Sequence, residues 1–165
     1  MKLLKKALLY DISNIAWTVA DCPGIETHAL HQVRDICQEG NIDRVSRVLG
    51  LAYSQILSVL FPILKAPGIN IDRDISKHPR DYVLIFRDDR CLKFFLTQEL
   101  KLRIKETCHE YMVAMVLADW LAITLPEAAE VWKERALACF EALREIANSA
   151  MISSASSFRR KLSPF

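Results

Sequence analysis

The chain has 165 residues, of which 52% are hydrophobic and 25% charged, and its formal net charge is +2 at pH 7. This length fits one domain with a sizeable core, and the near-neutral charge gives no support for general nucleic-acid binding, which needs a strongly basic face. The five cysteines are odd in number and contain no CxxC pair, so we expect free thiols in a reducing compartment rather than a disulfide framework.

The N-terminal segment reads MKLLKKALLYDISNIAWTV. Lysines followed by apolar residues are typical of a signal peptide, but Asp11, Ser13 and Asn14 interrupt the apolar part and no convincing cleavage site follows. Leucine, isoleucine, alanine and valine recur at helical spacing, which predicts an amphipathic first helix over residues 2–20. The proline and glycine at 23–24 then predict a turn.

Two further helices are predicted before residue 65. The second covers about residues 27–38, and the third covers about residues 42–64 with Asn41 as its N-cap. Apolar residues recur at helical spacing along the third helix, so one of its faces should be buried. We expect Pro62 to kink or end its last turn, because proline cannot donate a backbone hydrogen bond.

Between residues 66 and 89, prolines, a glycine and charged residues break the helical pattern. The segment contains a run of strand formers, which predicts one strand and a possible interface: Tyr82, Val83, Leu84, Ile85 and Phe86. A partner strand around residues 69–75 would complete a small hairpin. Because an isolated hairpin is marginal in water, the strand should pack on the helices or pair with another chain through its exposed edge.

The longest apolar run extends from Tyr111 to Ile123, within a fourth helix for which Thr97 is the candidate N-cap. A helix that is apolar on nearly all sides should lie in the core. The run is too short for a membrane span, which needs about 18 to 20 apolar residues, and it contains Asp119. We therefore expect a buried helix and no membrane association.

A fifth helix is predicted to begin at Pro126, because proline is accepted in the first turn, with Thr124 as its N-cap. The fourth and fifth helices should form an antiparallel hairpin. Large side chains mark its core: Tyr111, Met115, Trp120, Trp132 and Phe140. The predicted fold is therefore mainly α, a bundle of about five helices over residues 1–150 with a small β-hairpin or single strand within 66–89.

Residues 151–165 are predicted to form a flexible or extended tail, because serines and small residues disfavour a packed helix. The end of this tail combines basic and apolar side chains: Arg159, Arg160, Lys161, Leu162, Pro164 and Phe165. Such a segment could dock on a partner, and a solvated, disordered end is the alternative.

No group of residues specifies a reaction. His109 and Glu110 begin like the HExxH motif of zinc proteases, but the second histidine is missing, so His109 is expected to be buried or interfacial. His28, His31 and Asp35 could share one face of a helix as metal ligands, but no fourth ligand is evident and ordinary polar-face residues explain the spacing as well. We expect no metal, no cofactor and no catalysis.

Asp119 is the one carboxylate inside the apolar run. A buried carboxylate needs a compensating partner, so we expect it to pair with an arginine or with a helix N-terminus. A general-base role is the alternative. A helical enzyme that uses a metal or cofactor around His28, His31 and Asp119 is therefore kept as a third functional hypothesis.

The predicted hairpin carries a pattern of aromatic and small residues: Tyr111, Ala114, Leu117, Ala118 and Trp120 in its first helix, and Ala129, Trp132, Phe140 and Leu143 in its second. This pattern resembles the C-terminal helical pair of head–tail connector proteins of tailed phages and prophages, which are also called adaptor or head-completion proteins. The resemblance covers roughly a third of the chain and rests on the spacing of aromatic and small residues along two helices rather than on a signature motif.

The resemblance implies a structural virion protein that forms a homo-oligomeric ring, commonly of twelve subunits, between the portal protein and the tail or neck proteins. Genome DNA would pass through the channel without sequence-specific binding. The protein would be assembled in the host cytoplasm, be located in the virion neck, and grip a neighbour with its basic tail. Adaptor, stopper and tail-completion roles stay open. The alternative is a cytoplasmic helical module that binds or regulates a partner protein.

Overall fold

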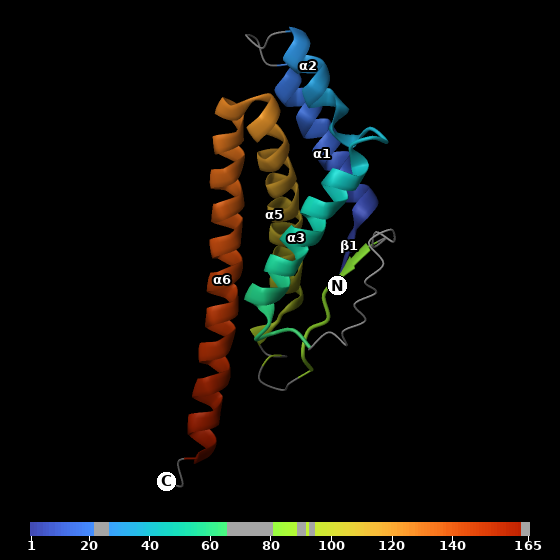
Figure 1. Ribbon diagram of the computed structural model, residues 1–165. Helices are drawn as coiled ribbons and strands as arrows, with labels where there is room; N and C mark the ends of the chain where they lie inside the picture. The colour runs from blue at the N-terminus through green and yellow to red at the C-terminus, as the bar shows by residue number, and fades with distance from the viewer. Residues whose placement is uncertain (22–26, 66–80, 89–91, 93–94, 163–165) are drawn as a thin grey trace.

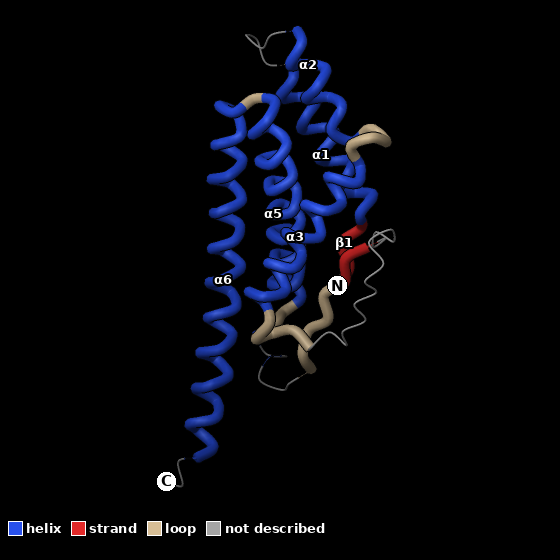
Figure 2. Tube along the Cα trace, in the orientation of Figure 1, coloured by secondary structure: helices blue, strands red, loops and turns tan. Residues whose placement is uncertain are grey.

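A computed structural model describes residues 1–21, 27–65, 81–88, 92 and 95–162, without the side chains of 27–29 and 153–162. Within these ranges the protein is a helical bundle with a two-stranded antiparallel sheet (Figures 1 and 2). This confirms the predicted mainly α fold. The elements in chain order are β1 (Lys2–Leu4), α1 (Lys5–Ala20), α2 (Thr27–Arg34), the 3-10 helix η1 (Asp35–Cys37), α3 (Ile42–Leu60), β2 (Asp81–Val83), α5 (Gln98–Thr124) and α6 (Pro126–Leu162).

Helix α5 forms the centre of the bundle and packs against α1, α3 and α6 (Figure 1). Its apolar run is buried as predicted from Tyr111 to Leu121, except that Met115 is half-buried and Asp119 is exposed. The last two residues of the predicted run, Ala122 and Ile123, are exposed, so the prediction is wrong at this end. The hydroxyl of Thr97 accepts a hydrogen bond from the amide of Leu100 at 3.2 Å, which confirms the predicted N-cap. None of the described helices combines the length and the hydropathy that a membrane-spanning helix needs.

The α5–α6 hairpin has the predicted turn but a different cap. Pro126 is the first residue of α6, and the carbonyl of Leu125 accepts hydrogen bonds from the amides of Ala128 and Ala129. Thr124 is the last residue of α5, and its hydroxyl donates to the carbonyl of Trp120 at 3.2 Å. The predicted N-cap role of Thr124 is therefore wrong, because the chain leaves α5 one residue later than expected.

The first helix begins later than predicted, because residues 2–4 form β1. Leu3 pairs with Tyr82 across the sheet, and both side chains are buried. Leu4, its neighbour in β1, is 50% exposed, as the alternation of side chains along a strand requires. The predicted strand at Tyr82 thus has its partner at the N-terminus of the chain. The partner expected around residues 69–75 lies outside the described residues.

Several helix ends differ from the sequence predictions. Helix α3 ends at Leu60, before Pro62. Asn41 precedes α3, but its side chain donates to the carbonyl of Asp35 at 2.8 Å and does not cap the helix. Helix α6 continues past Ala150 to Leu162, so residues 151–162 are helical where an extended tail was predicted. Continuation from the packed part of α6 avoids the cost of a new helix nucleus, which outweighs the low helix propensity of the serines.

Candidate functional site

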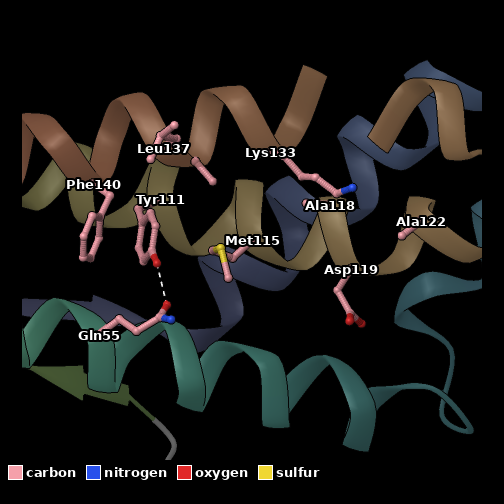
Figure 3. Close-up of a pocket in the computed structure, with 10 residues that line it drawn as sticks. Gln55, Tyr111, Met115, Ala118, Asp119, Ala122, Lys133, Leu137 and Phe140 are labelled. Carbon is pink, nitrogen blue, oxygen red and sulfur yellow. Dashed lines mark hydrogen bonds between the residues drawn. The ribbon is translucent and has the colours of Figure 1, made fainter. Parts of the chain in front are cut away.

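A cavity of about 530 Å³ opens between α3 and the α5–α6 hairpin (Figure 3); we call it the hairpin groove. Its floor is a strip of α5 at helical spacing, formed by the half-buried Met115, the buried Ala118 and the exposed Ala122. Leu137 of α6 and Gln55 of α3 stand on opposite sides. The groove is therefore apolar along its base, with polar groups at its ends, which is a common design of binding sites in helical proteins.

One end of the hairpin groove is aromatic. The rings of Tyr111 and Phe140 lie with their centroids 5.6 Å apart, and the Tyr111 hydroxyl donates to the side-chain carbonyl of Gln55 (Figure 3). Burial raises the pKa of Tyr111, so the phenol keeps its proton and remains a hydrogen-bond donor at neutral pH. This contact joins α5 to α3 and closes this end of the groove.

The other end carries an ion pair. Arg44 of α3 donates to the Oδ2 atom of Asp119 from Nη2 at 2.7 Å and from Nε at 3.0 Å. The guanidinium also lies 5.5 Å from the ring centroid of Trp120. The predicted pairing of Asp119 with an arginine is confirmed. The predicted burial is wrong, because the Asp119 side chain is 43% exposed where α3 diverges from α6 and leaves α5 uncovered.

The residues considered for metal or acid–base chemistry do not converge. His109 lies between two helices, and its Nε2 atom is 2.7 Å from the Oδ2 atom of Asp11 in α1, which agrees with an interfacial histidine. His31 is exposed, and Asp35 contacts the side-chain amide of Gln38. The side chain of His28 lies outside the described residues. No three His, Cys, Asp or Glu side chains in the described part of the chain form a group that could hold a metal ion.

Three cysteines within the described ranges are free thiols: Cys37, Cys108 and Cys139. Burial raises the pKa of each of them, and for Cys108 the value reaches about 12, with the nearby Cys139 as a second cause. A thiol with a raised pKa holds little thiolate at neutral pH. These cysteines therefore have the character of packed core residues.

The predicted interface strand is embedded in the fold. Tyr82 and Leu84 are buried, and Phe86 is half-buried, whereas Val83 and Ile85 are 46% and 56% exposed. Residues of an antiparallel strand direct their backbone groups alternately to its two edges, and both edges of this strand are in use. Leu84 exchanges two hydrogen bonds with Met1, the residue that precedes β1.

The opposite edge of the same strand faces α3 and the chain that follows it. The Tyr53 hydroxyl donates to the carbonyl of Val83 at 2.6 Å, and the amide of Lys65 donates to the carbonyl of Ile85 at 2.8 Å. The amide of Arg87 in turn donates to the carbonyl of Ile63. A partner strand therefore finds its nearest available edge on the outer side of β1 and not on the predicted strand.

The predicted core and tail residues occupy different parts of the hairpin. Tyr111 and Trp120 are buried, and the half-buried Met115 and Phe140 line the groove. Trp132 is also half-buried, with the guanidinium of Arg135 5.3 Å from its ring centroid. The basic part of the predicted tail belongs to the last turns of α6, at Arg159, Arg160, Lys161 and Leu162, with their side chains outside the described set; Pro164 and Phe165 lie outside it entirely.

Sequence reasoning missed several residues of the groove, chiefly Gln55, Lys133 and Leu137. Leu137 lies off the buried stripe of α6 and is 61% exposed. A large apolar residue among charged neighbours was the signal that could have identified it. Gln55 and Lys133 give no such signal, because polar residues are ordinary on exposed helix faces.

Comparisons with protein families, curated proteins and solved structures found no match to the chain. The resemblance to phage connectors therefore rests on the residue pattern of the hairpin, in particular Tyr111 and Trp120 in α5 and Trp132 and Phe140 in α6.

Proposed function

We propose that this chain is a structural assembly protein, a head–tail connector of the phage neck that forms a homo-oligomeric ring between the portal protein and the tail. In this proposal the protein catalyses no reaction, and its surfaces bind other subunits. The observation that carries the proposal is the hairpin groove, an apolar trough on the hairpin whose residue pattern resembles connectors.

The composition of the groove suits a subunit contact. Protein interfaces combine an apolar centre with a polar rim. Met115, Ala118 and Leu137 provide the apolar centre, and the Arg44–Asp119 pair provides charged groups at one end. A helix of another subunit that lies in the groove would cover the exposed Leu137 side chain.

The C-terminal part of α6 is a projecting helix that could complement the concave hairpin groove of a neighbouring subunit. Helix α6 has 37 residues and α5 has 27, which correspond to lengths of about 55 and 40 Å. In Figure 1 the C-terminal part of α6 extends well beyond the start of α5. A ring needs two different surfaces on each subunit that fit each other after a rotation, and a groove with a projecting helix meets this requirement.

Measurement of the assembled mass tests the proposal. We expect native mass spectrometry of the purified protein, alone or with portal protein, to show a closed oligomer of about twelve subunits. Negative-stain electron microscopy should show rings. A protein that stays monomeric at all concentrations, with portal protein present, would refute the connector and favour a monomeric helical binding module.

A pair of substitutions in α6 tests the role of the groove. Leu137→Asp places a charge in the groove, and Val131→Asp places one at a similarly exposed site outside it, since the two side chains are 61% and 64% exposed. We expect Leu137→Asp to abolish assembly and leave the helical circular dichroism unchanged, while Val131→Asp assembles. Equal behaviour of the two variants would exclude the groove as the subunit contact.

Deletion of residues 159–165 tests the basic tail. We expect the shortened chain to fold normally and to lose its assembly with neighbours, because these residues combine cationic and apolar side chains. Circular dichroism and thermal unfolding report the fold, and co-sedimentation with portal protein reports assembly. Unchanged assembly would remove the tail from the proposed mechanism.

A further inference from the structure

A second groove runs between β1 and α5, on a different part of the molecule from the hairpin groove. It consists of two adjoining cavities of about 330 and 380 Å³ that share Leu102 and Lys105 of α5. The first of them touches Lys2, Leu3 and Leu4 in succession. Because neighbouring strand residues point to opposite faces, a cavity that touches all three lies along the edge of β1. We call it the strand groove.

The outer edge of β1 carries backbone groups that could pair with another strand. Met1 exchanges two hydrogen bonds with Leu84, and Leu3 pairs with Tyr82. The alternation of an antiparallel ladder therefore directs the N–H and C=O of Lys2 and the N–H of Leu4 away from β2. The sheet has two strands in the described part of the chain, so these groups face the strand groove.

The helical wall of the strand groove is basic near Met1. Lys101 and Lys105 lie one turn apart on α5, and no carboxylate in the described ranges forms an ion pair with either of them. Leu4 and Leu102 beside them are 50% and 55% exposed. The cavity beside Leu4 also touches Glu106 and Glu110, of which Glu110 pairs with Arg135. The part of the groove near Met1 combines the strand edge with two cationic groups and an exposed aliphatic side chain, which suits an extended segment with carboxylates and aliphatic residues.

The sequence contains a segment with this chemistry. Residues 69–75 read Ile-Asn-Ile-Asp-Arg-Asp-Ile, in which Asn70, Asp72 and Asp74 alternate with three isoleucines and Arg73. In an extended strand, Asp72 and Asp74 would lie about 7 Å apart on one face. Lys101 and Lys105 are separated by about 6 Å along the axis of α5. The two spacings match, so both carboxylates can meet both ammonium groups at once.

We propose that the strand groove binds residues 69–75 of a second copy of this chain, as a strand added to the outer edge of β1. The aspartates face Lys101 and Lys105, and the opposite face, with its isoleucines and Arg73, lies beside Leu4. This inference rests on the proposed function, since it takes a neighbouring subunit as the donor. The inference adds a second contact between subunits, with the strand groove on one subunit and residues 69–75 on the other.

A charge exchange tests the inference. The receptor is full-length protein with Asp72→Lys and Asp74→Lys, whose own segment cannot compete, and the probe is a fluorescein-labelled peptide of residues 68–76. We expect the peptide to bind this receptor, and to bind about tenfold more weakly when Lys101→Glu and Lys105→Glu are added. A peptide with Asp72→Lys and Asp74→Lys should show the reverse preference. Fluorescence anisotropy measures all four combinations.

Two control results keep the inference separate from the proposed function. A matched receptor with Lys5→Glu and Lys6→Glu in place of the groove lysines should bind the peptide normally. Binding that does not depend on Lys101 and Lys105, or no binding at all, would overturn the inference. If the charge exchange succeeds and the natural chain forms dimers or open chains but no closed ring with portal protein, the strand groove stands and the connector ring is refuted. A natural chain that stays monomeric would overturn both.

Discussion

The α5–α6 hairpin and the β1–β2 corner are stabilised in opposite ways. The hairpin joins neighbours in sequence through the turn at Leu125 and Pro126. The corner joins Met1 to Leu84, which are 83 positions apart in the chain. Contacts between neighbours need little loop closure, whereas distant contacts must compensate for a larger loss of chain entropy. The comparison indicates that the hairpin is the part that folds readily and the corner the part that depends on the rest.

A cavity in the hairpin should have the largest effect on stability. Leu117 is fully buried in α5, and Leu117→Ala should lower the free energy of unfolding by about 3 kcal/mol. Ile123 in the same helix is 66% exposed, so Ile123→Ala should change it by less than about 0.5 kcal/mol. Urea unfolding followed by circular dichroism measures both. Similar losses in the two variants would contradict the central position of α5.

Alkaline pH should weaken both regions. Burial raises the pKa of Cys108 in the hairpin from 9.0 to about 12, and that of Tyr82 in the corner from 10.0 to about 12, with Cys139 and Tyr53 as the respective second causes. The folded protein holds these protons at pH values where the unfolded chain releases them, so stability falls as pH rises above about 9.

The expected loss is about 3 kcal/mol by about pH 11, most of it from Cys108. Urea unfolding at a series of pH values measures it. Cys108→Ala should flatten the profile from about pH 9 upward and Tyr82→Phe only from about pH 10 upward. A profile that is unchanged by either substitution would show that these groups do not control the alkaline limit.

Two tyrosines of the corner should respond in opposite directions. Their rings lie 5.0 Å apart, but the Tyr53 hydroxyl donates to the carbonyl of Val83, whereas the buried Tyr82 hydroxyl has no partner in the described structure. Tyr53→Phe should destabilise the fold by about 1 kcal/mol, and Tyr82→Phe should be neutral or stabilise it by up to about 1 kcal/mol. Urea unfolding of both variants checks this, and a larger loss from Tyr82→Phe would contradict the assigned hydrogen bonds.

The ion pair at the rim of the hairpin groove should have the smallest effect. Arg44 and Asp119 are both partly exposed, so Arg44→Ala should cost only about 0.5 kcal/mol, and less at about 1 M salt. A double-mutant cycle with Asp119→Ala isolates the pair from the contact between Arg44 and Trp120. A coupling above about 2 kcal/mol would show that the pair is more buried than its exposure indicates.

The sequence predicted the local features and missed the distant ones. The buried run of α5, the start of α6 at Pro126 and the Thr97 cap all follow from residues close to one another. The strand at Lys2–Leu4 could not be predicted, because its lysines and leucines fit a helix equally well and only the contact with β2 selects the strand.

The candidate site shows the same division. The partner type of Asp119 could be expected from chemistry, but its exposure depends on the angle at which α3 crosses the hairpin. The strand groove requires β1 to be known, so no pattern within α5 alone could identify Lys101 and Lys105 as its wall. Helix propensity also placed the end of α6 near Ala150, whereas the helix continues to Leu162.

The continuation of α6 fixes an orientation as well as a distance. Each residue of an α-helix turns the next by about 100°. One residue inserted after Ala150 would therefore turn everything beyond it to a different side of the molecule, while seven inserted residues would restore nearly the same bearing about 10 Å further out. The direction in which the last residues of α6 face therefore depends on the number of helical residues that precede them.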